Sequence, residues 1–398
     1  MKRFEDSEGL SPLALPDSAP VVDGTVYVGG EDLYALRTSD GSQRWQAGFT
    51  NDVETTPAVA NGLVLVESGQ TFYAVNTTDG TKQWHQPRGT IPRPDAATVA
   101  GDSVYVPGND LFKFDVDTGT KHWQFGPSGV PRSPAVADGR VFVPDTIGNF
   151  FARSAEDGSD LWHYESLNGS KLKAPAVDND TVYLSVTGDR SGAADLSIIN
   201  AFDVATGSVR WRYGGTTGEI STVTPAGNSV YVKDAGGALI ALDASSGKER
   251  WTTQVEGATD RPIVVNGVVL VGGADQLVAV DASNGDIRWT ASLQKPKVPA
   301  VVDGVVYVPT DNTITALAHG AEASETPSET ETSNQSTSER QTQSSATNET
   351  EGNVSRSTDA ADSSSQSSDG ASGFGPAAAL AGIAGALMDR RRRVADED

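Results

Sequence analysis

Short runs of alternating apolar and polar residues recur along the first 320 residues of the chain. Each unit opens with a short strand, often begun by proline, as at Pro134–Ala137. A glycine turn leads to a second strand such as Val104–Val106, and a third follows with the pattern of Leu33–Leu36. A period of two with β-branched and aromatic residues is typical of half-buried strands. No part of the repeat has a helical period, so the sequence predicts an all-β fold.

A fourth strand completes each unit and carries a tryptophan. It follows an Asp-Gly or Thr-Gly pair such as Asp40-Gly41 or Thr118-Gly119, which supplies the positive φ of a tight hairpin. By subtraction of residue numbers, the seven tryptophans are spaced by 39, 39, 39, 49, 40 and 38 residues. They are Trp45, Trp84, Trp123, Trp162, Trp211, Trp251 and Trp289. A period near 40 predicts a β-propeller of four-stranded antiparallel blades.

The number of blades depends on how the ring closes. Eight copies of the first three strands are visible, but no tryptophan strand follows the last copy, at Ile314–Leu317. The N-terminal segment Lys2–Gly9 resembles the segment Arg250–Gly257, and we expect it to supply the missing strand with Phe4 in the tryptophan position. The sequence thus predicts eight blades over residues 1–320. Seven complete blades with a ragged partial one is the alternative.

The consensus Gly-x-Val-Tyr-Val, Leu-Tyr-Ala-Leu-Asp and Thr-Gly-x-x-x-Trp resembles the pyrroloquinoline-quinone (PQQ)-type propeller repeat with its tryptophan-docking motif. The resemblance covers residues 1–318 and implies that each tryptophan packs between neighbouring blades. Quinoprotein dehydrogenases of that family hold the quinone over a tryptophan floor with Ca²⁺. Other members act as binding scaffolds without a cofactor. This chain has no cysteine, and its tryptophans all fall in the docking position. We therefore expect no catalytic, cofactor or metal site, with a quinoprotein enzyme as the rival.

Two departures from the repeat are candidate contact sites. The fifth unit carries about ten extra residues between its second and third strands, where Asp189, Arg190 and Asp195 are expected at the rim of one face. A solvated hairpin extension is the plain alternative. The second departure is a set of cations just before the first strand of several units. They are Arg132, Lys173 and Lys297, with Arg261 nearby.

Because first strands line the central channel of a propeller, these cations are expected at one mouth of it. There they are suited to an anionic small ligand or to a protein partner. Asp95 and Asp260 occupy the same place in other units, so a mixed, internally paired ring is also possible.

The charge of the chain argues against some classes of binding partner. The chain has 53 acidic and 30 basic residues, a formal net charge of −23, which argues against nucleic acid and anionic lipid. This acidity predicts either adaptation to molar salt (a halophilic protein) or an acidic extracellular protein. No sequence feature points to an oligomer, and we expect a monomer.

The C-terminal residues differ in kind from the repeats. Residues 321–372 are rich in Ser, Thr and Glu and are predicted to be a disordered linker. Residues 373–398 combine Gly373, Phe374 and Gly375 with a short apolar run and four arginines. They resemble the archaeal Pro-Gly-Phe sorting signal, with Ser372 in place of the proline. This implies processing by an archaeosortase and attachment at the cell surface. The chain begins Met1-Lys-Arg-Phe with no secretory signal, so an intracellular scaffold stays as the alternative.

Overall fold

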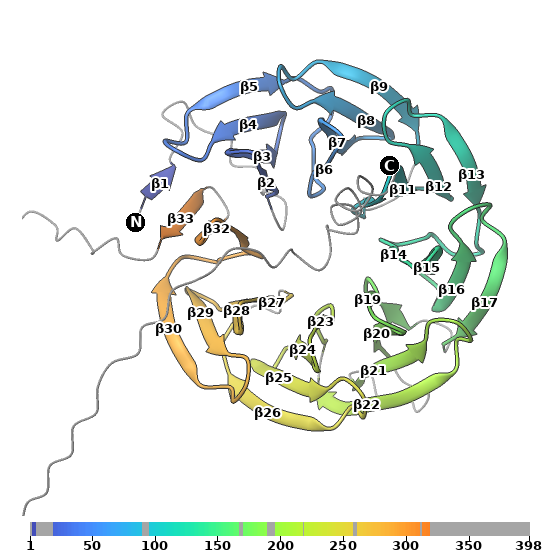
Figure 1. The fold of residues 1–398 in the computed structure, drawn as a ribbon, viewed down its shortest axis with the longest axis vertical. Helices are drawn as coiled ribbons and strands as arrows, with labels where there is room; N and C mark the ends of the chain where they lie inside the picture. The colour runs from blue at the N-terminus through green and yellow to red at the C-terminus, as the bar shows by residue number, and fades with distance from the viewer. Residues whose placement is uncertain are drawn as a thin grey trace, which may run out of the picture. The chain divides into compact units, whose positions relative to one another are not determined.

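The computed structural model describes residues 2–4, 19–89, 95–166, 170–188, 196–217, 219–257, 261–310 and 313–318. Within these residues the strands form eight antiparallel sheets, arranged as the blades of a closed ring (Figure 1). The predicted all-β, eight-bladed propeller is confirmed. The predicted boundaries at 320/321 and 372/373 fall outside the described residues and stay predictions. No helix in the described part of the chain is long and apolar enough to cross a bilayer.

The blades are numbered in chain order. Blade one contains β2 (Val21–Val22), β3 (Thr25–Gly29), β4 (Leu33–Arg37) and β5 (Gln43–Ala47). Blade two contains β6 (Ala58–Ala60), β7 (Leu63–Ser68), β8 (Thr71–Asn76) and β9 (Lys82–Pro87). Blade three contains β10 (Thr98–Ala100), β11 (Ser103–Pro107), β12 (Leu111–Asp115) and β13 (Lys121–Phe125). Blade four contains β14 (Ala135–Ala137), β15 (Arg140–Pro144), β16 (Asn149–Ser154) and β17 (Asp160–Glu165). Blade five contains β18 (Lys171–Leu172), β19 (Ala176–Asp178), β20 (Thr181–Thr187), β21 (Leu196–Asp203) and β22 (Val209–Thr217). Blade six contains β23 (Thr224–Ala226), β24 (Ser229–Lys233), β25 (Ala238–Asp243) and β26 (Glu249–Gln254). Blade seven contains β27 (Ile263–Val265), β28 (Val268–Gly272), β29 (Gln276–Asp281) and β30 (Ile287–Ser292). Blade eight contains β31 (Ala300–Val302), β32 (Val305–Pro309), β33 (Ile314–Ala318) and β1 (Lys2–Phe4).

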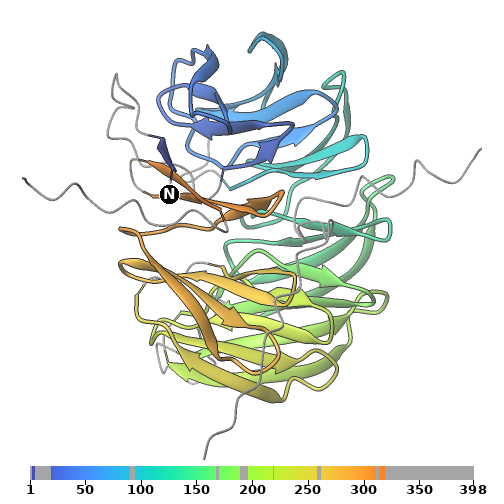
Figure 2. The same ribbon diagram turned by 60° about the vertical axis from the view of Figure 1, so that its left-hand side comes forward.

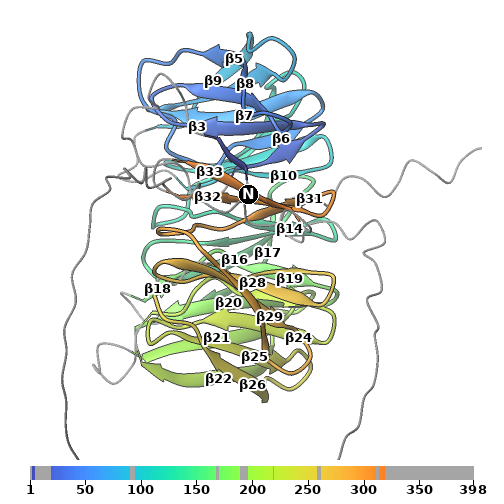
Figure 3. The same cartoon turned by 90° about the vertical axis from the view of Figure 1, so that its left-hand side faces the viewer.

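In each blade the first strand lies innermost and the last lies at the rim, and blade five has an extra short strand, β18, beside β20 (Figure 1). Figures 2 and 3 show the same ring turned to the side. The first hairpin is a two-residue turn. In blade one its residues, Asp23 and Gly24, have φ of 48° and 69°, the positive values that type I′ turns require. Turn chemistry therefore fixes the register of each blade, and inward-facing apolar residues then pack against the next blade.

Six tryptophans join one blade to the next. Each indole N–H donates to a backbone carbonyl that follows the third strand of the next blade. The pairs are Trp45–Thr77, Trp84–Val116, Trp123–Ala155, Trp162–Val204, Trp211–Ala244 and Trp251–Ala282, at 2.8–3.3 Å. The ring also lies on the turn glycine of that next blade: a Cβ added to Gly207 would be 2.6 Å from the indole of Trp162. Glycine is required there both for its φ of 70° and for this close approach.

The N-terminal strand closes the ring, as expected, but in a different register. β1 pairs with β33 so that Lys2 faces Ala316 and Phe4 faces Ile314. In blade seven Trp289 faces Ala279, the residue equivalent to Ala316. The assignment of Phe4 to the tryptophan position is therefore wrong by two residues. The other blades fix this register with a turn that contains glycine before the fourth strand, which blade eight lacks because its outer strand comes from the other end of the chain.

The same missing turn explains why Trp289 differs from the other tryptophans. Its side chain is 40% exposed, whereas Trp45, Trp162, Trp211 and Trp251 are 7–9% exposed. It forms no hydrogen bond with the described part of the chain. The implied docking role holds for six tryptophans, and the seventh lies at the seam of the ring.

Candidate functional site

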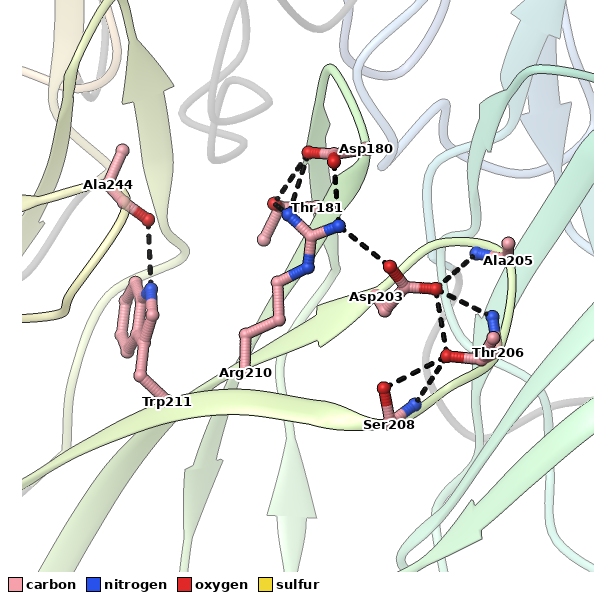
Figure 4. Close-up of polar contacts among 9 residues, drawn as sticks. All are labelled: Asp180, Thr181, Asp203, Ala205, Thr206, Ser208, Arg210, Trp211 and Ala244. Atoms are coloured by element: carbon pink, nitrogen blue, oxygen red, sulfur yellow. Dashed lines mark hydrogen bonds and ion pairs between the residues drawn. The ribbon is translucent and has the colours of Figure 1, made fainter.

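The two faces of the propeller carry different kinds of polar contact. On one face lie the turns between first and second and between third and fourth strands. In blade five Arg210 donates to Asp180 at 2.7 and 2.8 Å and to Asp203 at 2.7 Å, which ties these two turns together (Figure 4). Asp203 also accepts the backbone N–H of Thr206 at 2.9 Å. These bonds from Arg210 and Thr206 lower the pKa of Asp203. In this blade the charged side chains of the turn face pair with one another.

On the opposite face, the segments that lead into the innermost strands surround the axis of the ring (Figure 1), and we call this region the mouth. The backbone N–H groups of Arg132, Lys173 and Lys297 each donate to a backbone carbonyl of the second strand in the same blade, at or near the end of that strand, at 2.8–3.0 Å. Ser221 makes the same bond in blade six. Three of the four predicted cations therefore occupy equivalent positions at one end of the innermost strands. Arg261 lies one position later, directly before Pro262 and β27.

Two ion pairs occupy blades two to four at this mouth. Arg132 is 3.6 Å from Asp95, and Arg88 is 3.3 Å from Glu67. Glu67 and Arg88 are 2% and 3% exposed, and the Oε1 and Oε2 of Glu67 have no hydrogen-bond partner among the described residues. Burial raises the pKa of Glu67 to about 8, although Arg88 opposes the shift. Burial also raises the pKa of Asp95, against the attraction of Arg132. Arg88 and Arg132 therefore each have a carboxyl group as a close neighbour.

Blades five to seven contribute Lys171, Lys173 and Arg261 to the mouth. Lys171 and Lys173 share one carboxylate, that of Glu219, at 3.3 and 3.4 Å. Lys173 and Lys171 together lower the pKa of Glu219. Arg261 forms no hydrogen bond or ion pair with the described residues. It keeps some contact with solvent, yet the surrounding protein displaces enough water to lower its pKa. We call Lys171, Lys173 and Arg261 the basic sector.

Comparison with known proteins identifies the repeat. The family described as outer membrane protein assembly factor BamB (PQQ_2) matches residues 7–125, 108–262 and 257–354. The chain belongs to this family. A solved BamB from Moraxella catarrhalis is 16% identical, with a TM-score of 0.61, over 81% of this chain and 98% of that one. The computationally designed protein Ika8 gives a TM-score of 0.66 at 15% identity, over 80% of this chain and all of that one.

Two enzymes are also similar in part. A quinohaemoprotein alcohol dehydrogenase from Pseudomonas putida HK5 has a TM-score of 0.54 at 16% identity, over 77% of this chain and 73% of that one. Tetrathionate hydrolase of Acidithiobacillus ferrooxidans is 27% identical over 144 residues, 31% of this chain. The chain spans only 28% of the length of that hydrolase. The likenesses to solved structures show the fold of a BamB-type propeller.

A quinone site in the manner of the PQQ-type dehydrogenases does not fit the residues of this propeller. All seven tryptophans lie on outermost strands, and six are engaged with the neighbouring blade, so none can form a floor at the channel. His85, His122 and His163 are exposed on the outer strands of three different blades. Among the described residues, no three His, Cys, Asp or Glu side chains form a group that could hold a metal ion.

Some features of this face were not expected from the sequence. A cavity of about 340 Å³ lies between blades two and three, lined by Gln86, Pro87, Arg88, Gly89, Asn109, Asp110, Phe112, Phe114, Lys121 and Gln124. The buried Glu67–Arg88 pair beside it was also missed, although a charge inside the fully buried strand β7 was a signal for it. The predicted contacts Asp189, Arg190 and Asp195 lie outside the described residues. Gly373, Phe374 and Gly375 do so as well.

Proposed function

We propose that this protein is a non-enzymatic scaffold that binds a protein partner through the channel-mouth face. Membership of the BamB family, whose description names an assembly factor, supports a binding role. The observation that carries the proposal is the set of charged residues at equivalent positions of the mouth, where Arg132, Lys173 and Lys297 share one backbone register. Charges at equivalent positions around the axis of the ring favour specific association and set its orientation.

The proposal predicts that the mouth face, and not the turn face, captures the partner. The full chain is immobilised and exposed to native cell-surface fractions in high salt. The double variant Arg132→Gln/Lys173→Gln is expected to lose the captured protein. Arg288→Gln is the matched control, because Arg288 lies on the turn face and pairs with Asp281 at 2.6 Å. Equal capture by both variants would show that the mouth is not the binding face.

We place the scaffold at the cell surface of an organism living in high salt. The acidic composition and the resemblance of residues 373–398 to a sorting signal support this location. Mass spectrometry of the native C-terminus tests it, since sorting removes the terminal arginines. An intact Arg390–Asp398 on most molecules would favour the intracellular scaffold instead.

An enzymatic role is the second candidate, and the partial similarity to tetrathionate hydrolase is the observation that favours it. The purified chain is assayed for tetrathionate consumption, and for dye reduction after addition of the quinone with Ca²⁺. Turnover in either assay that is lost on heat denaturation would displace the scaffold proposal.

A further inference from the structure

The positive charge of the basic sector is not matched by carboxylates of the described chain. Glu219 compensates one of its two lysine partners. Asp234 and Glu256 lie on loops of blade six, but neither forms an ion pair with a described residue, and Asp234 accepts the backbone N–H of Ala238 at 2.7 Å. Asp260, which precedes Arg261, lies outside the described residues. In the described part of the chain, Arg261 is thus a cation at the channel mouth with no carboxylate partner.

An arginine in this position has an energetic reason to bind an anion. Its guanidinium stays charged under all physiological conditions, and protein has replaced much of its water. A charge that loses hydration without a partner is destabilising, and a charge-assisted hydrogen bond offsets that loss. The planar guanidinium presents two parallel N–H donors at the spacing of the two oxygens of a carboxylate.

We propose that the basic sector binds the carboxylate side chains of an acidic peptide segment of the partner, with Arg261 as the central contact. The inference rests on the proposed function and names the chemistry of the ligand at the same face. Arg261 would engage one carboxylate with both N–H donors. Lys173, which is 35% exposed and shares Glu219 with Lys171, is placed to attract a second.

The probe is fluorescein-labelled octaglutamate, and its binding to the full chain is followed by fluorescence anisotropy in molar KCl. The Debye length is then about 3 Å, so the net charge of −23 no longer repels the peptide and only close contacts remain. We expect Arg261→Gln to weaken binding roughly 10- to 100-fold, the range for a lost charged hydrogen bond. Lys173→Gln is expected to weaken it less, and it provides a second test if the Arg261 variant does not fold.

The controls separate carboxylate recognition from plain charge attraction. Arg288→Gln removes a cation of the turn face and is expected to bind octaglutamate as the wild type does. Octaglutamine is expected not to bind. The inference is overturned if octaglutamate does not bind, if Arg261→Gln binds as well as the wild type, or if octaglutamine binds equally. Displacement by phosphate at concentrations where acetate has no effect would assign the sector to phosphate instead.

The same variants distinguish failure of this inference from failure of the proposed function. In the capture experiment with native surface fractions, a partner held equally by wild type and Arg261→Gln would leave the scaffold function standing without the carboxylate contact. No captured partner, together with octaglutamate binding that depends on Arg261, would preserve the anion site and reject the scaffold.

Discussion

Replacing Trp162 and Trp289 separately tests whether indole docking holds the blades together. Trp162 is 9% exposed, and its indole N–H donates to the carbonyl of Val204 at 3.0 Å. Its ring centroid lies 5.8 Å from that of Phe142 and 5.7 Å from that of Phe150. Trp289 carries the same side chain at the equivalent position of blade seven, yet it is 40% exposed and lacks the interblade bond. Comparing the two tryptophan variants therefore isolates the contribution that the next blade makes to the free energy of unfolding.

The expected magnitudes follow from burial. A docked indole buries roughly 150–250 Å², which at about 25 cal/mol per Å² gives an upper bound of about 4–6 kcal/mol. Large-to-small substitutions in a core cost about 3–5 kcal/mol, so we expect Trp162→Ala to lower the free energy of unfolding by that amount. For Trp289→Ala we expect about 1–2 kcal/mol, because much of the ring stays in water and a hydrogen bond worth roughly 1 kcal/mol is missing.

The assay is urea unfolding of the full chain in a fixed high-salt buffer, followed by circular dichroism. The slope of the unfolding free energy against urea concentration has to be the same for all variants, because only then does a shifted midpoint report a change in stability alone. Gly207→Ala provides an independent check, because the added methyl group would strike the indole of Trp162. Equal losses for Trp162→Ala and Trp289→Ala would refute the argument that the neighbouring blade supplies the stability.

Two further predictions concern pH. Burial raises the pKa of Glu67 to about 8, so the folded state binds more protons than the unfolded state between about pH 4.5 and 8. The stability linked to this group is present at low pH and is lost as pH rises through 8; Glu67→Gln should flatten that fall in urea unfolding, and an unchanged slope would contradict the burial argument. Asp203 has the opposite sign, because Arg210 lowers its pKa: Asp203→Asn should be less stable than the wild type at pH 7, and the difference should shrink as pH falls below the unfolded pKa of about 4. A difference that stays constant between pH 7 and pH 2 would mean that the carboxylate charge is not what ties the two turns.

The fold was predictable because local signals specify each blade separately. The Asp-Gly and Thr-Gly pairs set the hairpins, and the alternation of apolar residues sets the buried face, so neither feature depends on distant contacts. The closing strand was placed correctly as a partner of the last blade, but its register was not, because no turn joins Lys2–Phe4 to β33. Where the chain supplies a strand from its other end, sequence alone leaves a shift of two residues open, since such a shift keeps the same side chains on the same face.

The candidate site was predictable only in part. The repeat placed Arg132, Lys173 and Lys297 at one mouth, because equivalent positions in successive blades lie at equivalent heights in a ring. Their partners followed no such rule: Glu219 lies 46 residues beyond Lys173, in the connection that enters blade six. Pairing across blades depends on side-chain direction and on the width of the channel, which the repeat does not encode. The structure was needed to show that Arg88 and Arg132 each have their own carboxyl neighbour, whereas Lys171 and Lys173 share one.

The contrast between the two faces bears on which of them binds a partner. On the turn face, arginines are committed to aspartates of their own blade, as in the pairs Arg250–Asp243 and Arg288–Asp281, at 2.7 and 2.6 Å. Breaking such pairs for a partner would forfeit existing bonds, so net affinity would be small. At the mouth, Arg261 forms no such pair with the described residues, and Lys171 and Lys173 share a single acid. A ligand that supplies a carboxylate to Arg261 adds a bond there without removing one, which supports our proposal of the mouth as the binding face.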